Sequence, residues 1–333
     1  MNDRLRTVLV PTLAAACAVA MTASASAAEK NTHSELRVEG IGKTLEQGTN
    51  YSNASIGTRN SKACGPTDSR RERLRGANAM GLVGHAARVN RRLKPFRTSD
   101  TFDFGLIVCQ IGDFKGLDAN RSWLYKVNHE FASVGGDQLK VGRGDEVLWY
   151  FANFSTGQNT GDELDLRNVP VSVRPGQPFQ VRVVGYDASG DPSPAAGARV
   201  RGGASSTTDP AGRTTVVARA TPGTMRLRAV RGDDIASAPV EVCVANDLSR
   251  CPDARGEGFV GTDDADAIRA TGGPDSIRPR GGRDTVAARG GADSVAVRGG
   301  GRDRVNCGPG RDRVRADRED RVGDSCEVVK RRR

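Results

Sequence analysis

The chain is poor in aromatic residues and in histidine, and it lacks the common catalytic motifs. Only 5% of the 333 residues are aromatic, with two tryptophans and three histidines. No H-E-x-x-H zinc motif and no G-x-S-x-G nucleophile elbow occurs. Acidic pairs such as Asp263 with Asp264 fall in expected turns, where solvated charge explains them. We therefore expect neither catalytic nor cofactor-binding residues, and we predict that the protein is not an enzyme.

Long apolar runs are also missing after the first thirty residues, which excludes a transmembrane helix in the mature chain. The beginning has basic residues at Arg4 and Arg6, an apolar stretch over residues 8–21 and small residues up to Ala28. This pattern predicts a secretory signal peptide over residues 1–28. An uncleaved anchor and lipidation at Cys17 remain alternatives. We expect a protein that is secreted, extracellular or associated with the cell wall.

Cysteine is scarce, and its spacing does not suggest a metal site. Seven cysteines occur, none in a C-x-x-C pair, and no histidine lies near them at zinc-ligand spacing. Without Cys17, the even number that remains favours disulfides in an oxidising compartment. Six cysteines allow many pairings, but proximity in the sequence favours Cys64 with Cys109, Cys243 with Cys251, and Cys307 with Cys326.

Charge of one sign is not gathered into a stripe, although the formal net charge is +10. Arginine and aspartate are interspersed along the chain, and only residues 330–333 form a purely basic run within the expected tail over residues 327–333. Basic and acidic residues that are interspersed in this way argue against a nucleic-acid-binding protein. For an exported protein, we expect an anionic cell-wall polymer as a more plausible partner than a nucleic acid.

Residues 34–155 have the pattern of a small α+β domain. Alternation over residues 36–40 predicts a half-buried strand. An apolar face at helical spacing predicts a helix over residues 76–89. Residues 123–127 and 147–151 are rich in aromatic and β-branched residues, which is typical of strands.

The same segment resembles a known module. Residues 122–128, the Val134-Gly135-Gly136 triplet and residues 142–150 resemble the closing half of the transcobalamin C-terminal-like domain, and residues 38–40 resemble its opening strand. The resemblance implies a small α+β module, which in the transcobalamins caps a bound corrinoid. The large helical domain that completes that cage is absent, so cobalamin binding does not carry over. Binding of a small corrinoid-like ligand remains an alternative.

The aromatic residues of this segment have two interpretations. Aromatic side chains favour half-buried sheet positions, so packing in the core explains them. The alternative is a ligand surface, and its members would be Trp123, Tyr125, Trp149 and Tyr150.

Residues 166–245 change to short alternating runs separated by Gly, Pro and Asp, which predicts a β-sandwich. Six such runs lie at residues 169–173, 179–183, 198–200, 214–217, 225–229 and 240–244. The turn phrases at residues 175–177, 187–190, 197–200 and 209–212 resemble bacterial immunoglobulin-like domains. That resemblance implies a spacer or an adhesive unit.

Residues 261–326 carry a repeat in which an aspartate precedes an Ile or Val by two positions. The aspartates are Asp266, Asp275, Asp284, Asp293, Asp303, Asp312 and Asp320. The first four are nine residues apart, and Gly301 lengthens the next interval by one. Such a period predicts a parallel β-roll with two units in each winding and the Ile or Val in its core.

The repeat resembles the haemolysin-type calcium-binding nonapeptide, in which aspartate and turn carbonyls hold Ca²⁺. Two units per winding would stack Asp266 beside Asp284 and Asp275 beside Asp293, and these four are the predicted metal ligands. Asp303 and Asp312 are less suited, because Gly301 breaks the register.

Arginine weakens this calcium prediction. The first two glycines of the consensus are mostly lost, and Arg280, Arg289 and Arg298 stand at the second position. Between residues 270 and 316 there are ten arginines and five aspartates, so guanidinium groups are available to neutralise the carboxylates. Binding of Ca²⁺ is one alternative, and a metal-free roll or a partly disordered tail is the other.

The sequence thus predicts a multidomain, mainly β protein: a small α+β domain, then a β-sandwich, then a short parallel β-roll. The expected function is that of a secreted, non-catalytic binding or cell-surface-associated protein with degenerate calcium-binding-type repeats. A calcium-dependent structural protein is the alternative from another class.

Overall fold

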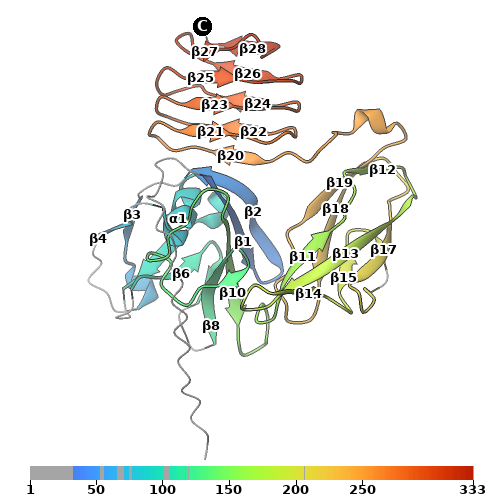
Figure 1. Ribbon diagram of the computed structural model, residues 1–333. Coiled ribbons are helices and arrows are strands. Elements are labelled where there is room, and N and C mark those ends of the chain that lie inside the picture. Colours follow the sequence, from blue (N-terminus) through green and yellow to red (C-terminus); the bar gives the residue numbers. More distant parts are fainter. Residues whose placement is uncertain are drawn as a thin grey trace, which may run out of the picture.

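The computed structural model is mainly β, with several sheets and a single α-helix among its described residues (Figure 1), as the sequence predicts. It describes residues 33–52, 56–65, 71–74, 77–100, 105–116, 118, 120–205 and 207–332. The predicted signal peptide with Cys17, and the last residue of the basic tail, lie outside this part. Within it, no helix is long and apolar enough to cross a membrane.

The N-terminal part of the chain forms a sheet around two parallel central strands. These are β1 (His33–Gly40) and β10 (Glu146–Asn153), which place Val38 beside Trp149. The sheet continues through antiparallel pairing to β2 (Lys43–Ser52), β8 (Arg121–Val127) and β9 (Glu130–Phe131). Leu36 and Val38 of β1 are fully buried, which confirms the predicted alternation.

Helix α1 (Ala79–Val89) packs against this sheet. It begins three residues after the predicted start, because the Asn78 side chain caps it by accepting the N–H of Gly81 at 2.6 Å. Met80 and Val83 are fully buried in the core between helix and sheet. Shorter elements complete this module: β3 (Ile56–Arg59), η1 (Lys62–Cys64), β4 (Arg71–Leu74), η2 (Arg91–Leu93), β5 (Phe96–Ser99), β6 (Ile107–Ile111) and β7 (Phe114–Lys115).

The middle of the chain is a two-layered β structure. One layer contains β11 (Glu163–Arg167), β13 (Pro178–Tyr186), β14 (Pro192–Pro194), β16 (Ala204–Ser205) and β17 (Arg213–Val217), and the other contains β12 (Ser172–Val173), β15 (Arg199–Arg201), β18 (Gly223–Val230) and β19 (Val240–Val244). Val181 and Val183 of one layer share a core with Leu227 and Val242 of the other. The 3-10 helix η3 (Leu248–Arg250) follows. The predicted run at residues 169–173 is shortened to β12, and β11, β14 and β16 were not predicted.

The C-terminal part is a roll of short parallel strands on two faces. One face contains β20 (Gly258–Val260), β22 (Ser276–Arg278), β24 (Ser294–Ala296), β26 (Arg313–Ala316) and β28 (Val328–Arg331), and the other contains β21 (Ala267–Arg269), β23 (Thr285–Ala287), β25 (Arg304–Asn306) and β27 (Arg321–Val322). Ile268 lies beside Val286, and Ile277 beside Val295. Two repeat units therefore make one winding.

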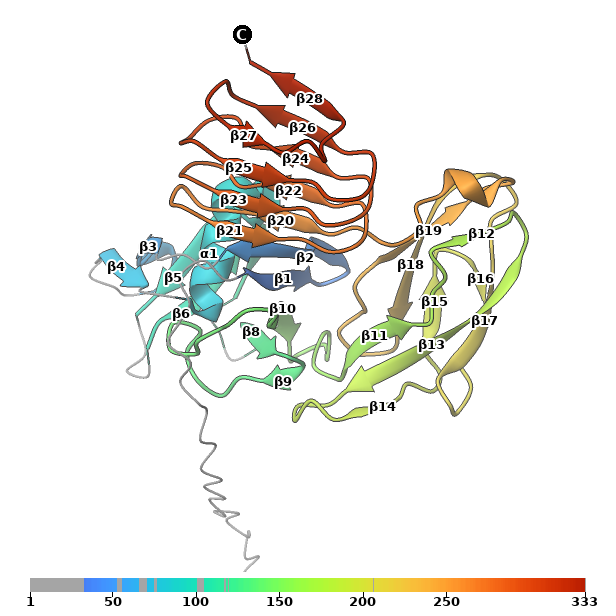
Figure 2. The ribbon, with the colours of Figure 1, turned by 45° about the horizontal axis from the view of Figure 1, so that its top comes forward.

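The roll is continuous with the N-terminal sheet, which the sequence did not predict. Strand β20 pairs in parallel with β2, where Asn50 lies beside Phe259 and Tyr51 beside Val260. One ten-stranded sheet consequently runs from β9 through β1 and β2 to β28 (Figure 2). The roll begins at Gly258, before the predicted boundary at Gly261, because its first strand completes the edge of the neighbouring sheet.

The three predicted disulfides are present. They join Cys64 to Cys109, Cys243 to Cys251, and Cys307 to Cys326. Cys307 and Cys326 belong to the core of the roll, and each of the three bridges constrains a different part of the chain.

Candidate functional site

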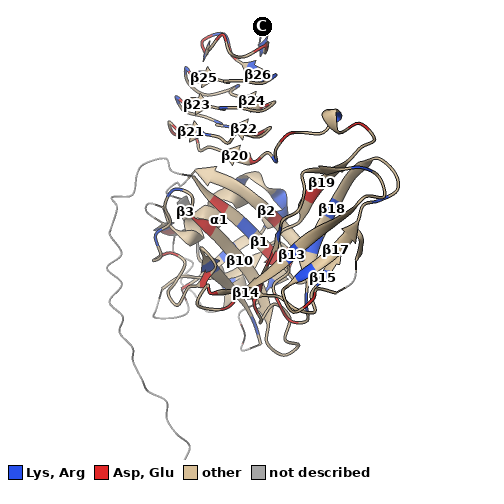
Figure 3. Ribbon diagram, turned by 45° about the vertical axis from the view of Figure 1, so that its right-hand side comes forward, with Lys and Arg blue, Asp and Glu red and all other residues tan. Residues whose placement is uncertain are grey.

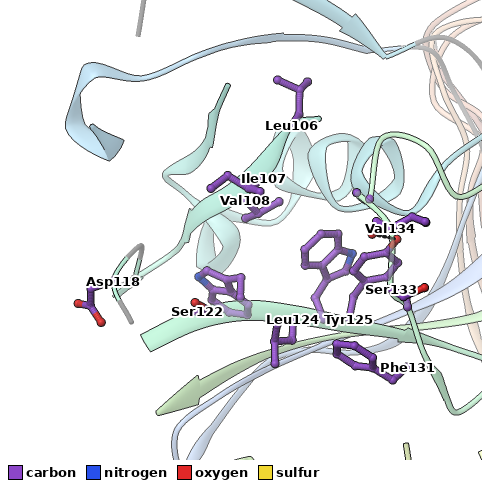
Figure 4. A pocket seen from close by; sticks show the side chains of 16 residues that line it. Leu106, Ile107, Val108, Asp118, Ser122, Leu124, Tyr125, Phe131, Ser133 and Val134 are labelled. Atoms are coloured by element: carbon purple, nitrogen blue, oxygen red, sulfur yellow. Dashed lines mark hydrogen bonds between the residues drawn. The ribbon is translucent and has the colours of Figure 1, made fainter. Parts of the chain in front are cut away.

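The N-terminal module contains a cavity of about 510 Å³ between β6, β8, β10 and the segment 131–136 (Figure 4). Most of its wall is aliphatic or aromatic, and polar groups are few. The apolar lining includes Leu106, Val108, Trp123, Tyr125, Phe131 and Trp149, and the polar lining includes Asp118 and Ser122. A cavity of this size and composition is typical of a site for a small apolar ligand.

Three of the four predicted ligand-surface aromatics form one wall of this cavity. Trp123 and Tyr125 are two positions apart on β8 and therefore face the same side of the sheet. Trp149 lies opposite Tyr125 on β10, and their rings stack with centroids 4.7 Å apart. The structure brings these three residues together, and all three are buried in the core of the module, so their role as a ligand surface stays a prediction.

Hydrogen bonds to the backbone fix the orientation of these rings. Trp149 Nε1 donates to the carbonyl of Ala79 at 3.1 Å, and Trp123 Nε1 donates to that of Phe114 at 2.9 Å. Tyr125 Oη donates to the carbonyl of Val134 at 2.8 Å. Burial raises the pKa of Tyr125, so its hydroxyl remains a donor. The polar tips are satisfied within the module, and a ligand would meet the apolar parts of the rings.

Tyr150 does not belong to this wall. It follows Trp149 on the same strand and so points to the opposite face, where it packs with Leu148, Ala152 and Ile235. Its inclusion in the predicted ligand surface is therefore not supported by its position, because adjacent residues of a strand face opposite sides.

The sequence marked the lining residues Val134, Gly135 and Gly136 only through the resemblance, and it did not mark Leu106, Val108 or Phe131. Leu106 and Val108 come from β6 and its approach, which were not predicted as a strand. Phe131 and Val134, which are 38% and 44% exposed, belong to the same lining. These two side chains extend the apolar lining of the cavity to the surface of the module.

A second candidate site is the ladder formed by the seven repeat aspartates, each at most 5% exposed. Oδ1 of Asp284 accepts the backbone N–H of Asp266 at 2.9 Å, and Oδ1 of Asp293 accepts that of Asp275 at 2.8 Å. The predicted stacking of these two pairs is therefore present. The carboxylates act as acceptors for backbone donors of the preceding winding, in a buried environment where an unpaired N–H would be costly.

Asp303 and Asp312 continue the same ladder, contrary to expectation. Their Oδ1 atoms accept the N–H groups of Asp284 and Asp293, each at 2.8 Å. Gly301 does not break the register, because the turn over residues 299–301 accommodates it with positive φ angles of +87° and +117° at Gly299 and Gly300.

Burial and repulsion shift the protonation of the ladder. Burial, and after it the neighbouring carboxylates Asp303 and Asp266, raise the pKa of Asp284 to about 7 against the opposing N–H bond. The pKa of Asp293 is raised to about 6, mainly by burial. The expected neutralisation by arginine does not occur. In the described part of the roll, Arg280 with Asp263 at 3.0 Å is the one ion pair, and Asp263 lies outside the ladder.

The fit of the ladder to Ca²⁺ is partial. Five of the ladder aspartates each have one carboxylate oxygen without a hydrogen-bond partner. These atoms are Oδ1 of Asp266 and Oδ2 of Asp284, Asp293, Asp303 and Asp312. A cation would satisfy these buried atoms and relieve the repulsion between them. Among the described residues, however, no three His, Cys, Asp or Glu side chains are placed to hold one metal ion. Backbone carbonyls would have to supply the remaining ligands, because Ca²⁺ takes six to eight oxygens.

A buried charge cluster lies between the N-terminal module and the β-sandwich, and no pattern in the sequence predicted it. Glu163 of β11 is 3.2 Å from His129 Nδ1, 3.3 Å from Arg37 Nη1 and 3.8 Å from Lys126 Nζ. The His129 ring stacks on Tyr186 with centroids 3.6 Å apart. Burial opposes ionisation of Glu163, but the nearby His129, Arg37 and Lys126 outweigh it and lower its pKa. The cluster joins the two modules electrostatically.

One segment of the chain matches a model of a known protein family. Residues 107–153 match a family model described as a domain of unknown function, DUF4430. The matched residues span β6 to β10 and contain Trp123, Tyr125 and Trp149 of the cavity wall. This match supports a transcobalamin-like module in that segment and does not extend to the sandwich or the roll. No curated protein matches the chain.

Proposed function

We propose that this protein is a secreted, non-catalytic binding protein whose N-terminal module holds a small apolar ligand in the cavity beside Trp123, Tyr125 and Trp149. The observation that carries the proposal is the cavity itself, about 510 Å³ in volume and lined mainly by aromatic and aliphatic side chains. Its size favours a compact ligand. The sandwich and the roll then act as the surfaces and spacers of a modular extracellular protein.

The chain offers an internal probe for this proposal. Its two tryptophans, Trp123 and Trp149, both line the cavity, so the whole tryptophan emission reports on that site. The test is a titration of the mature chain with 1-anilinonaphthalene-8-sulfonate, followed by energy transfer from tryptophan to the probe. We expect saturable transfer and displacement by compact apolar competitors. Transfer that does not saturate would contradict the proposal.

We propose Ca²⁺ binding by the roll as a second function. It is motivated by the unpartnered buried oxygens of Asp284, Asp293, Asp303 and Asp312. Calcium would stabilise the roll by linking carboxylates of successive windings, with turn carbonyls as further ligands. Calorimetric titration of the mature chain with Ca²⁺, and with Mg²⁺ as a control, tests this function. The absence of calcium-specific heat would exclude it.

A further inference from the structure

Acidic and basic residues that alternate along the repeat are separated when the roll folds. In the run from Asp312 to Arg315, Asp312 and Val314 are buried while Arg313 and Arg315 are exposed. The separation follows from the strand geometry, because successive side chains point to opposite faces. The same holds along the roll, whose exposed arginines are Arg269, Arg278, Arg283, Arg289, Arg298, Arg302, Arg304, Arg311, Arg313, Arg315, Arg318, Arg321 and Arg331. Figure 3 marks the positions of these charges along the ribbon.

The buried aspartates do not neutralise this surface. Their Oδ1 atoms accept backbone N–H groups inside the roll. No ion pair involves Arg304, Arg313, Arg315 or Arg321 in the part of the roll that the structure describes. A chain in which the two signs alternate thus presents mainly cations to the outside.

The cations are aligned on the last windings of the roll. Arg304 lies directly beside Arg321 on one face, and Arg315 lies beside Lys330 on the other. Neighbouring strands are about 4.8 Å apart, so like charges repeat at that interval along the roll axis. Like charges directly opposite each other destabilise a sheet. An anionic partner with several charges would remove that cost.

The chemistry of the surface defines the partner. Guanidinium groups bind phosphate through two parallel hydrogen bonds, which favours arginine over lysine at such a surface. Proteins that bind single-stranded nucleic acid also stack bases on aromatic side chains. No aromatic residue follows Phe259 in the sequence, and Phe259 is buried. The surface therefore suits a phosphate chain without bases.

We propose that the last windings of the roll bind a linear phosphate polymer that wraps around the roll, from the column of Arg304 with Arg321 on one face to the column of Arg315 with Lys330 on the other. A linear polymer contacts several windings at once, and each further contact adds to the affinity. Binding through phosphates is expected to weaken as the salt concentration rises, because counterions compete for both partners. This site is distant in sequence from the apolar cavity and independent of it.

The test uses the mature chain and short-chain inorganic polyphosphate, with binding followed by calorimetry at low salt. The roll variant combines Arg304→Gln, Arg313→Gln, Arg315→Gln and Arg321→Gln. The control variant removes the same charge from exposed positions of the sandwich: Arg174→Gln, Arg199→Gln, Arg201→Gln and Arg213→Gln. We expect the Kd of the roll variant to rise at least about tenfold with a shallower salt dependence, and that of the control to change less than about twofold.

Three results would overturn the proposal. Equal weakening in both variants would mean that net charge alone attracts the polymer. An unchanged Kd in the roll variant would place binding elsewhere. Tighter binding of single-stranded DNA with the same number of phosphates would make the surface a nucleic-acid site. Circular dichroism checks folding, and the variant with only Arg304→Gln and Arg321→Gln gives a milder test, in which we expect a smaller rise in Kd.

Discussion

The backbone N–H of Asp284 donates a 2.8 Å hydrogen bond to Oδ1 of Asp303, one winding further along the roll. The same bond joins Asp293 to Asp312. Each carboxylate thus has a structural role through one oxygen, while Oδ2 of all four residues has no hydrogen-bond partner. The repeated aspartate consequently contributes a hydrogen bond to the roll whether or not the roll binds a cation.

Loss of the acceptor is expected to cost more than loss of the charge. Asp303→Ala leaves the buried N–H of Asp284 without a partner, and we predict a loss of about 1–3 kcal/mol in the free energy of unfolding. Asp303→Asn keeps a carbonyl oxygen at that place, so we expect a clearly smaller loss. Urea unfolding of both variants measures the difference. Equal losses would show that the hydrogen bond is not what the aspartate contributes.

The roll is expected to lose stability as the pH rises. The pKa values of Asp284 and Asp293 are about 7 and about 6 in the folded chain, above the ordinary value of 3.8. A raised pKa means that the folded state binds the proton more tightly. The stabilisation that the protonated Asp284 and Asp293 provide is complete below about pH 4, and it is lost as the pH rises through 6 and 7.

Thermal unfolding at pH 5 and pH 8 measures this effect. The double variant with Asp284→Asn and Asp293→Asn has no proton to lose at these positions, so its unfolding temperature should depend less on pH than that of the unchanged chain. An identical dependence in the two proteins would show that these carboxyl groups do not titrate with raised pKa values.

Calcium is expected to act most strongly where the ladder is ionised. At pH 8 the carboxylates repel one another, and a bound cation would offset that repulsion, whereas at pH 5 protons compete for the same oxygens. We predict that Ca²⁺ raises the unfolding temperature more at pH 8 than at pH 5, and that Asp284→Asn reduces the increase. A rise that is equal at both pH values, or that Mg²⁺ reproduces, would argue against a specific site.

The contact between the N-terminal module and the sandwich depends on Glu163. Glu163→Ala would remove a carboxylate that Arg37 and Lys126 share, although Arg37 keeps its ion pair with Glu39 and Lys126 keeps two backbone carbonyls. We therefore expect a loss of about 1–3 kcal/mol in the free energy of unfolding. Asp165→Ala removes the ion-pair partner of Arg167, but the two side chains are 40% and 45% exposed, so the loss should cost at most about 1 kcal/mol. Urea unfolding compares the two variants.

A spectroscopic measurement separates an electrostatic effect from a simple loss of packing. The pKa of His129 is raised in the folded chain, because the nearby Glu163 carboxylate outweighs burial. Nuclear magnetic resonance titration should show that this pKa falls in Glu163→Ala and remains raised in Asp165→Ala. No change in either variant would mean that the two side chains are not coupled.

Local periodicity predicted the parts of the structure that depend on neighbouring residues. The nine-residue spacing of aspartates is enough to predict windings of two units, and the alternation at Leu36 and Val38 is enough to predict a strand. Tyr150 was assigned to the ligand surface because it is aromatic, although the same alternation places it on the opposite face from Trp149.

Contacts between distant segments could not be predicted in this way. Pairing of Asn50 with Phe259 joins residues from opposite ends of the chain, and no local pattern marks either as a partner of the other. The charge cluster at Glu163 likewise depends on contacts between residues that are far apart in the sequence. Strand geometry places Arg313 and Asp312 on opposite faces of their strand. Which of the two side chains points into the roll is known only from the folded structure, in which Asp312 is buried and Arg313 is exposed.

The most direct test of the proposed function compares two variants in the tryptophan energy-transfer titration. Ala132→Phe introduces a ring beside the cavity, which Ala132 lines, and Ala292→Phe makes the same change at an exposed turn of the roll. We predict that Ala132→Phe raises the Kd of the apolar probe at least about tenfold, since it fills space that the ligand needs, and that Ala292→Phe leaves it unchanged. Equal Kd values for the two variants, with circular dichroism showing both folded, would contradict the claim that the cavity binds the ligand.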